Sequence, residues 1–291
     1  MDVAVPCYDL HSHSTASDGT LTPTALIERA LRQGVDVLAL TDHDVLDGLE
    51  EAEAAARASR LRLIPGVEIS VNWGSRVIHI VALDIDPSHP LLCRGLEDLR
   101  GQRLQRAERI GQRLARLGIE GAWAGARELA GGQIVTRSHF AQYLVNAGVV
   151  SDFQAAFRRY LRQGRPAYVA CEWTSLEQAV QWIVAAGGQA VIAHPARYGL
   201  SGLKLRMLLD DFKTAGGAAL EVVSSSHNPA ETRKMAELAR RHGLLASVGS
   251  DFHSPEQGWA ELGRVAALPP ICIPIWHDWG IDRRRKNLNT G

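Results

Sequence analysis

The stretch Asp9–Thr20, DLHSHSTASDGT, is the clearest indication of the fold in this sequence. It overlaps a short run, Tyr8–His11, that is typical of a β-strand, and it places His11 and His13 at the end of that strand. Because residues i and i+2 of a strand face the same side, both imidazoles can reach one metal ion. An isolated His-x-His pair is as often a chance arrangement as a metal site. The prediction of a metal site therefore depends on the polar residues at the other strands.

Further apolar runs follow, and most are separated by amphipathic stretches typical of helices. A helix begins at Thr22-Pro23, with threonine as N-cap and proline in the first turn. The expected strands after the first are Val35–Thr41, Leu61–Ile69, Val77–Ile85, Ala190–Ala193, Ala218–Val223 and Leu245–Val248. Seven strands, mostly joined by helices, predict an α/β fold with either a parallel barrel or a doubly wound sheet.

Residues 96–165 break this alternation, because they show helical patterns and few strand signals. We therefore predict a discontinuous barrel built from residues 1–95 and 166–281. Residues 96–165 would form a helical insertion, or lid domain, between the fourth and fifth strands. The polar and basic residues 282–291 are expected to form a flexible tail.

Polar residues gather where the predicted strands end, which is where active sites form in parallel α/β folds. Besides the first strand and Asp18 in the loop after it, these residues are Asp42, His43, Asp44, Glu68, His194, Asp251 and His253, with His79 inside strand four. Each has an ordinary explanation: His43 in a solvated turn, Glu68 as a cap, His79 as a core histidine. Coincident accidents at six strands are a weaker explanation than one shared metal site.

The candidate ligands are nitrogen and oxygen donors without a thiolate, which suits Mn²⁺, Fe²⁺ or Zn²⁺. They are His11, His13, Asp18, His43, Glu68, His79, His194, Asp251 and His253. Nine ligands are too many for one ion, so we expect two or three divalent ions, Mn²⁺ first among them, with a carboxylate such as Glu68 bridging two. Ions held about 3.5–4 Å apart can generate a metal-bound hydroxide and clamp a phosphoryl group. No protein nucleophile is then needed.

These motifs resemble those of the PHP (polymerase and histidinol phosphatase) family. The matching segments are DLHSHSTASDGT, LTDHD, PGVEIS, AHPARYG and SDFH, and together they span almost the whole chain. The resemblance implies a distorted (β/α)7 barrel whose mouth holds three metals. It further implies three ligand groups, namely His11, His13, Glu68 and Asp251; Asp18, His43 and His253; and Glu68, His79 and His194.

Within that family the chain is similar to a subgroup with a helical insertion, the 3′,5′-nucleoside bisphosphate phosphatases. The shared segments are TRSHFAQYLV, RPAYV and AGGQAVIAHPARYG. The resemblance implies hydrolysis of the 3′-phosphate of nucleotides such as pAp, giving AMP and phosphate. Some members of the subgroup are also 5′→3′ exoribonucleases, so short RNA is a second expected substrate.

Arginines in the insertion are candidates for binding a phosphate-rich substrate. From Arg106 to Arg116, four of them share one helix face, and a solvated surface is the simplest interpretation of that face. Arg103 falls on the apolar side instead, and a buried arginine needs an anionic partner. Arg137 and His139 begin a later helix, which suits phosphate binding, although they can equally cap the helix.

Arg197 follows His194 by three residues and can reach the same pocket. The predicted substrate-binding residues are therefore Arg103, Arg137, His139 and Arg197.

Three alternatives remain open at this point. The first is a histidinol-phosphate-type phosphatase, against which the long arginine-bearing insertion argues weakly. The second is an amidohydrolase acting on C–N bonds; its form with a carboxylated lysine bridge is excluded, because no lysine precedes Lys204. The third is a non-catalytic, metal-stabilised nucleic-acid-binding module, which a complete ligand set disfavours.

The overall composition limits the partners. The formal net charge is zero, so no overall field draws the chain to nucleic acid or to a membrane, and any basic surface must be local. No apolar run approaches the roughly 18 residues needed to span a bilayer, and the N-terminus lacks a signal pattern. The four cysteines have no CxxC spacing, which fits a cytoplasmic protein without disulfides. No protein partner is implied.

Overall fold

The computed structural model describes residues 6–279 and contains one mixed sheet. Along the sheet, neighbouring strands follow the order β1-β2-β3-β4-β6-β7-β8, and β5 pairs with β3 off this path. The strands are β1 (Tyr8–Asp9), β2 (Val37–Leu40), β3 (Arg62–Trp73), β4 (Arg76–Leu83), β5 (Thr174–Ser175), β6 (Gln189–Ile192), β7 (Ala219–Ser224) and β8 (Leu245–Gly249). The sequence predicted all of these except the two-residue β5.

The first and last strands approach one another and nearly close the sheet into a barrel. The Leu10 amide, directly after β1, donates to the Val248 carbonyl at 3.0 Å. Farther along, the Asp251 amide donates to the His11 carbonyl at 2.9 Å. These contacts confirm the predicted barrel of seven strands and bring the ends of β1 and β8 to one rim.

One strand runs against the expected direction. The pairs of β4 with β3 and with β6 are antiparallel, whereas β1-β2, β2-β3, β6-β7 and β7-β8 are parallel. The expectation of an all-parallel sheet is therefore wrong for β4. A tight turn through Gly74, with φ of 55°, joins β3 to β4 as a hairpin. This reversal places the amino-terminal half of β4 at the rim where the other strands end.

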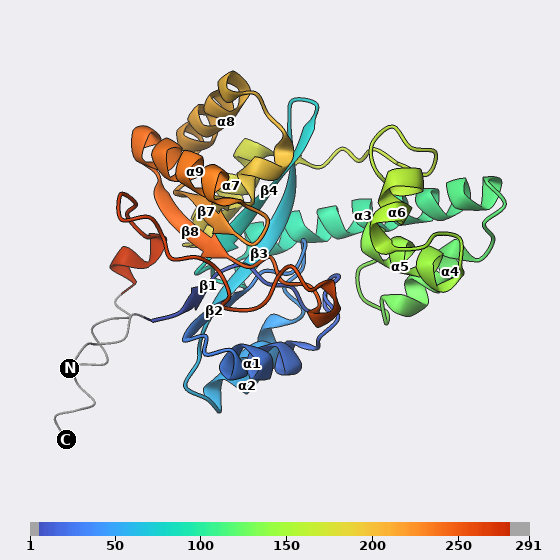
Figure 1. The fold of residues 1–291 in the computed structure, drawn as a ribbon, viewed down its shortest axis with the longest axis horizontal. Helices are drawn as coiled ribbons and strands as arrows, with labels where there is room; N and C mark the ends of the chain where they lie inside the picture. The colour runs from blue at the N-terminus through green and yellow to red at the C-terminus, as the bar shows by residue number, and fades with distance from the viewer. Residues whose placement is uncertain (1–5, 280–291) are drawn as a thin grey trace.

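Helices pack around the outside of the barrel (Figure 1). They are α1 (Pro23–Arg32), α2 (Leu49–Arg57), α7 (Leu176–Ala185), α8 (Gly202–Thr214) and α9 (Pro229–His242), with short 3₁₀ turns at Pro195–Tyr198, Pro255–Gln257 and Ile275–Asp278. The predicted cap of α1 is confirmed, because the Thr22 hydroxyl accepts from the Ala25 amide at 3.2 Å. Among residues 6–279, no helix combines the length and the apolar character that crossing a bilayer requires.

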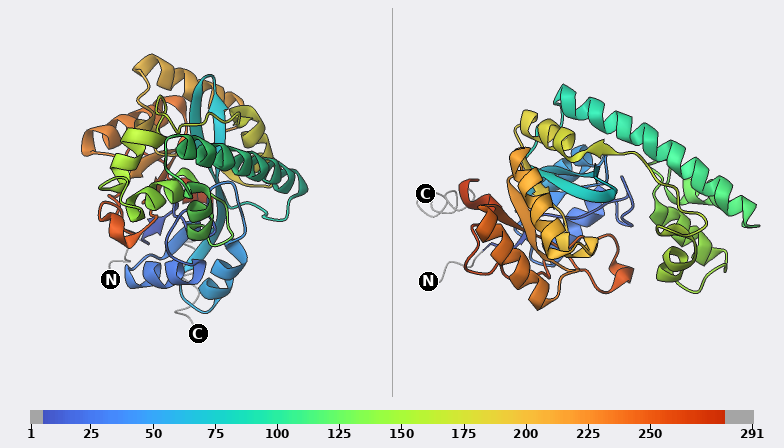
Figure 2. Two further views of the ribbon diagram at one scale, coloured as in Figure 1. Left: turned by 90° about the vertical axis from the view of Figure 1, so that its right-hand side faces the viewer. Right: turned by 90° about the horizontal axis from the view of Figure 1, so that it is seen from above.

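The remaining helices extend away from the barrel: the longest one runs outward from it, and the shorter ones gather at the far end of that helix (Figure 2). They are α3 (Pro90–Arg116), α4 (Ala122–Leu129), α5 (Arg137–Asn146), α6 (Phe153–Ala156) and a π-helical turn at Phe157–Leu161. The carboxyl-terminal half of α3 and the helices after it share their own apolar core, which includes Phe140 and Leu144. Residue 96, the predicted start of the insertion, lies inside α3, so the boundary stays a prediction. Residues 280–281 of the predicted barrel and the predicted tail 282–291 lie outside the described residues.

The first half of α3 packs tightly against α7. A Cβ at Gly95 would come within 2.6 Å of the buried indole ring of Trp182. At Gly101, less than two turns later in the same helix, a Cβ would meet nothing within 4 Å. The two glycines therefore test how closely the longest helix is packed onto the barrel.

We expect the same substitution to have opposite effects at these two glycines. Gly95→Ala should lower the free energy of unfolding by about 1–3 kcal/mol, because the ring of Trp182 cannot move aside without disturbing the core. Gly101→Ala should raise it by roughly 0.5–1 kcal/mol, because alanine restricts the unfolded chain and favours the helix. Urea unfolding followed by circular dichroism measures both values. A stabilised Gly95→Ala variant would contradict the tight α3–α7 contact.

Candidate metal centre

The nine predicted ligands lie together at one rim of the barrel. They come from the ends of β1, β2, β6 and β8, from the middle of β3, and from the amino-terminal half of β4. Eight of them fall into three overlapping groups of potential metal ligands: His11, His13, Glu68 and Asp251; His13, Asp18, His43 and His253; and His43, Glu68 and His79. The ninth, His194, has its Nε2 atom 3.0 Å from Glu68 Oε1.

The first group has the spacing of ligands around one ion. The Nε2 atoms of His11 and His13 lie 3.4 and 3.3 Å from Glu68 Oε2, and 3.5 and 3.3 Å from Asp251 Oδ1. Ligand atoms at about 2.1 Å from a tetrahedral ion lie about 3.4 Å from one another. Two imidazole nitrogens and two carboxylate oxygens therefore converge on a volume suited to a divalent cation.

Glu68 connects this group to the others. Its Oε1 atom lies 2.9 Å from His79 Nδ1 and 3.0 Å from His194 Nε2, while its Oε2 atom lies 3.0 Å from His43 Nδ1. On the far side, Asp18 Oδ1 lies 3.8 Å from His43 Nε2 and 3.4 Å from His253 Nε2. Both oxygens of one buried carboxylate are thus shared between neighbouring ligand groups.

The cluster contains buried polar atoms that protein groups do not satisfy. Within the described part of the chain, these atoms accept or donate no hydrogen bond: His11 Nε2, both ring nitrogens of His13, Asp18 Oδ1, His43 Nδ1, Glu68 Oε2 and His194 Nδ1. A buried polar atom without a partner costs about 1–3 kcal/mol. Several such atoms facing one centre fit divalent ions, which would give them partners.

The charges in the cluster hold its groups in mixed protonation states. Burial alone would raise the pKa of Glu68, but the imidazoles of His43, His79 and His11 hold it well below its usual value. Burial, followed by the neighbouring charge of His253, lowers the pKa of His13 to about 3. Burial disfavours the charged form of His253 too, yet Asp18 and Asp251 raise its pKa to about 9. Without a metal, the cluster keeps protons that metal binding must displace.

The backbone is bent sharply at three positions in the cluster. Asp44, His194 and Asp251 have positive φ values of 53°, 29° and 55°, which are uncommon for residues other than glycine. Asp44 directly follows the predicted ligand His43. His194 and Asp251 are themselves predicted ligands and lie two residues after the ends of β6 and β8. At these positions the backbone leaves the strand direction, and the side chains can point toward the centre of the rim.

Glu221 on β7 is a functional candidate that sequence reasoning missed. Its side chain is buried; Oε1 lies 3.1 Å from His11 Nδ1, and Oε2 accepts from the His194 backbone amide. Such a carboxylate fixes the tautomer of a metal-binding histidine and turns its other nitrogen toward the ion. The available signal was one glutamate inside the apolar run ALEVVS, where nothing else calls for a charge.

Two of the predicted substrate-binding arginines already have carboxylate partners. Arg103 is buried; its Nε donates to Asp44 Oδ2 at 2.6 Å and its Nη2 to the Ser70 hydroxyl at 2.7 Å. The partner of Arg197 is Asp251, which its Nη1 contacts at 2.6 Å. Arg197 remains about half exposed at the rim.

The other two predicted substrate contacts lie at the start of α5, which docks on the metal cluster. The Thr136 amide donates to His139 Nδ1 at 3.0 Å, so His139 does cap the helix. The hydroxyls of Thr136 and Ser138 donate to Asp18 Oδ2 at 3.2 and 2.8 Å. These contacts bring the residues on either side of Arg137, a predicted substrate-binding residue, to the cluster.

Comparison with known proteins gives consistent matches. The PHP domain matches residues 9–189. A 3′,5′-nucleoside bisphosphate phosphatase of Chromobacterium violaceum is 49% identical over 271 residues, covering 93% of this chain and 95% of that protein. A 5′-3′ exoribonuclease of Haemophilus influenzae is 48% identical over 269 residues, covering 92% and 97%. A solved structure from Chromobacterium violaceum, described as an amidohydrolase with bound sulfate and no metal, superposes with a TM-score of 0.90 at 48% identity, covering 94% and 95%.

The contact between Glu221 and His11 predicts an effect on metal affinity. Glu221→Gln keeps the shape of the side chain but removes the charge that supports His11, so metal affinity should fall roughly 10- to 100-fold. Competition with a chromophoric chelator measures the affinity, and circular dichroism checks the fold. The exposed Glu177 on α7 provides the control, since Glu177→Gln should leave the affinity unchanged. Equal affinities for the two variants would contradict a role for Glu221.

The protonation of His253 predicts that metal binding releases protons. At pH 7.5 the metal-free imidazole is charged, because its pKa is about 9, whereas a metal ligand must be neutral. Apparent metal affinity should therefore rise by about tenfold per pH unit for each released proton up to about pH 9. Calorimetry at pH 7.5 in buffers of different ionisation enthalpy counts the protons. A binding heat that does not depend on the buffer would show that metal binding releases no proton from His253.

Proposed function

Because this chain belongs to the PHP domain family, we propose that it is a metal-dependent phosphatase that removes the 3′-phosphate of nucleoside 3′,5′-bisphosphates, converting pAp to AMP and phosphate. The names of relatives nearly half identical over almost their whole length support this substrate. The observation that carries the proposal is the buried Glu68 carboxylate, whose two oxygens are shared between adjacent ligand groups. That arrangement suits a multinuclear centre.

The cluster would hold two or three ions, with Mn²⁺ as the first candidate and Fe²⁺ or Zn²⁺ as alternatives. The residues proposed to hold them are His11, His13, Asp18, His43, Glu68, His79, His194, Asp251 and His253. When bound, such ions activate water and stabilise the charge that develops on a phosphoryl group. The protein holds the donors apart at fixed distances, which its outer hydrogen bonds maintain.

The hydroxyl groups at the rim support attack by water and not by a side chain. Ser14 and Ser17 donate their hydroxyls to Asp42 at 2.6 Å, and Ser12 donates to the Ala39 carbonyl at 2.7 Å. Each serine serves to hold the loop after β1, and none has a histidine positioned as its base. A protein nucleophile is therefore not part of the proposed reaction.

The substrate would be oriented by the positive groups that surround the rim. Arg197, which pairs with Asp251 and is about half exposed, would contact a phosphate oxygen at the cluster. Arg137 at the start of α5 would contact the second phosphate, with His139 holding the helix start. Arg103, which is paired with Asp44, would act by positioning α3 beside the cluster.

Exonucleolytic cleavage of short RNA is a second candidate activity. Residues 96–165 carry twelve arginines and six acidic residues, although the whole chain has no net charge. A local basic surface favours phosphodiester backbones. We propose a cytoplasmic location for both activities, where nucleotides and short RNA are available.

The proposed function is tested by measuring phosphate release from pAp before and after metal removal. Chelation should abolish activity, and added Mn²⁺ should restore it best. The protein should release phosphate from pAp much faster than from AMP, because AMP lacks the 3′-phosphate that the proposed reaction removes. Undiminished activity in metal-free protein would refute the proposed mechanism.

A variant pair separates the cluster from general effects on the fold. Glu68→Gln should lose both bound metal and turnover, since it disturbs neighbouring ligand groups together. Glu97→Gln, at an exposed position on α3, should retain both. Normal metal content and turnover in Glu68→Gln would remove the observation on which the proposal depends.

A further inference from the structure

A short segment at the start of α5, residues 134–138, docks the helical body onto the barrel rim; this body comprises the second half of α3 and the helices α4, α5 and α6. Ile134 is buried and forms a small apolar cluster with Ala16 and Val45, which lie in the loops after β1 and β2. Ala16 stands two residues before Asp18, and Val45 stands two residues after His43. The helical body therefore contacts the two loops that carry predicted ligands of one metal group.

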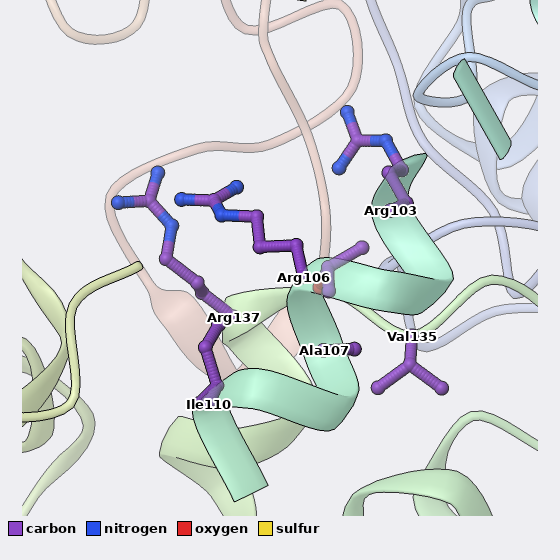
Figure 3. Close-up of a pocket in the computed structure, with 7 residues that line it drawn as sticks. Arg103, Arg106, Ala107, Ile110, Val135 and Arg137 are labelled. Carbon is purple, nitrogen blue, oxygen red and sulfur yellow. The ribbon is translucent and has the colours of Figure 1, made fainter. Parts of the chain in front are cut away.

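The same segment also packs on α3. Val135 belongs to the apolar core that Ala107 and Ile110 of α3 share. Residues 135–137 line a small pocket together with four residues of α3, and Figure 3 shows Val135 and Arg137 next to this stretch of the helix. The start of α5 is thus held between α3 and the ligand-bearing loops.

Two hydroxyl groups of the segment hold one oxygen of Asp18. Thr136 and Ser138 donate to Asp18 Oδ2 at 3.2 and 2.8 Å. The Ser138 amide in turn donates to the Thr136 hydroxyl oxygen at 3.1 Å. Because that oxygen already accepts the amide, its own hydrogen is directed toward Asp18. The two hydroxyls thus form one connected set of donors to the carboxylate.

The other oxygen of Asp18 faces the metal cluster. Asp18 Oδ1 lies 3.8 Å from His43 Nε2 and 3.4 Å from His253 Nε2, and only 5% of the side-chain surface is exposed. Among residues 6–279 this oxygen has no hydrogen-bond partner. The hydroxyls on Oδ2 therefore determine which oxygen faces an ion, as outer partners do for other metal-binding carboxylates.

We propose that Ser138 and Thr136 are positioning residues of the metal centre, so that an ion bound by Asp18, His43 and His253 and the docking of the helical body stabilise one another. This inference rests on the proposed function, because it requires the metal centre. An ion on Oδ1 fixes the rotation of the carboxylate and presents Oδ2 to the two hydroxyls. Such coupling is reciprocal, since docking must raise ion affinity by the same factor by which the ion favours docking.

The coupling reaches the substrate side of the rim as well. Arg137, a predicted substrate-binding residue, stands between Thr136 and Ser138. Filling of the Asp18 group consequently also fixes the place from which Arg137 acts. The sequence predictions included Arg137 and its neighbour His139 but gave neither hydroxyl a role.

The experiment compares Ser138→Ala with Ser151→Ala. Ser151 is exposed, follows α5, and its hydroxyl likewise donates to an aspartate, Asp152 Oδ2, at 2.8 Å. In competition with a chelator, Ser138→Ala should bind one Mn²⁺ ion roughly 10- to 100-fold more weakly than the unaltered protein. Ser151→Ala should match the unaltered protein. Ser138→Thr keeps a hydroxyl and should stay within about threefold of it.

Hydrogen exchange gives a readout that depends on neither affinity nor turnover. In the unaltered protein and in Ser151→Ala, Mn²⁺ should slow amide exchange at residues 134–140 by roughly tenfold, because the ion stabilises the docked segment. In Ser138→Ala this slowing should be lost.

Three results would overturn the inference. They are equal Mn²⁺ affinities in Ser138→Ala and Ser151→Ala, a loss in Ser138→Thr as large as that in Ser138→Ala, and exchange at the start of α5 that Mn²⁺ does not slow in the unaltered protein. If Ser138→Ala loses affinity as expected but the unaltered protein does not hydrolyse pAp, the proposed substrate is wrong and the positioning role of Ser138 stands.

Discussion

The buried carboxylate of Glu68 is the constraint on which the rest of the structure depends. Five imidazoles, those of His11, His13, His43, His79 and His194, approach one or other of its oxygens within 3.4 Å. A buried charge is tolerated only where such partners surround it. Their strands therefore have to meet around β3, and the nearly closed barrel with its reversed β4 brings them there. The same proximity leaves donor atoms without protein partners, which makes the rim a place for divalent ions.

Charge also joins the helical body to the barrel. Arg103 of α3 reaches Asp44 after β2, and the first turn of α5 donates two hydrogen bonds to Asp18. Both carboxylates stand next to or among the predicted ligands. The distance between the metal cluster and the arginines of the helical body is consequently set by direct contacts, which is what recognition of a substrate with two phosphates requires.

Particular residues show how far sequence patterns reach and where they end. The ends of apolar runs predicted where the donors would gather, because strands of one barrel deliver their ends to a common rim. The same patterns did not predict the direction of β4, since alternation of apolar and polar residues is identical in both directions along a strand. Glu221 was missed because only its partners, His11 and the His194 amide, reveal its purpose. Helical periodicity assigned Arg106 to a solvated face, but in the folded chain Arg106 is partly buried and its Nε donates to the Val169 carbonyl. Arg103, which the sequence proposed for the substrate, pairs with Asp44.

The sequence by itself determined the chemical character of the site, namely nitrogen and oxygen donors at successive strand ends and an arginine-rich insertion. These features are local, because periodicity decides which face of a strand or helix a side chain occupies. Tertiary structure alone decided which charges are compensated. Asp44 and Arg103 are 59 residues apart in sequence, yet they form an ion pair, whereas Arg106 and Arg137 form none among the residues that the structure describes. Compensation of charge depends on long-range neighbours, and no local pattern records which neighbours those are.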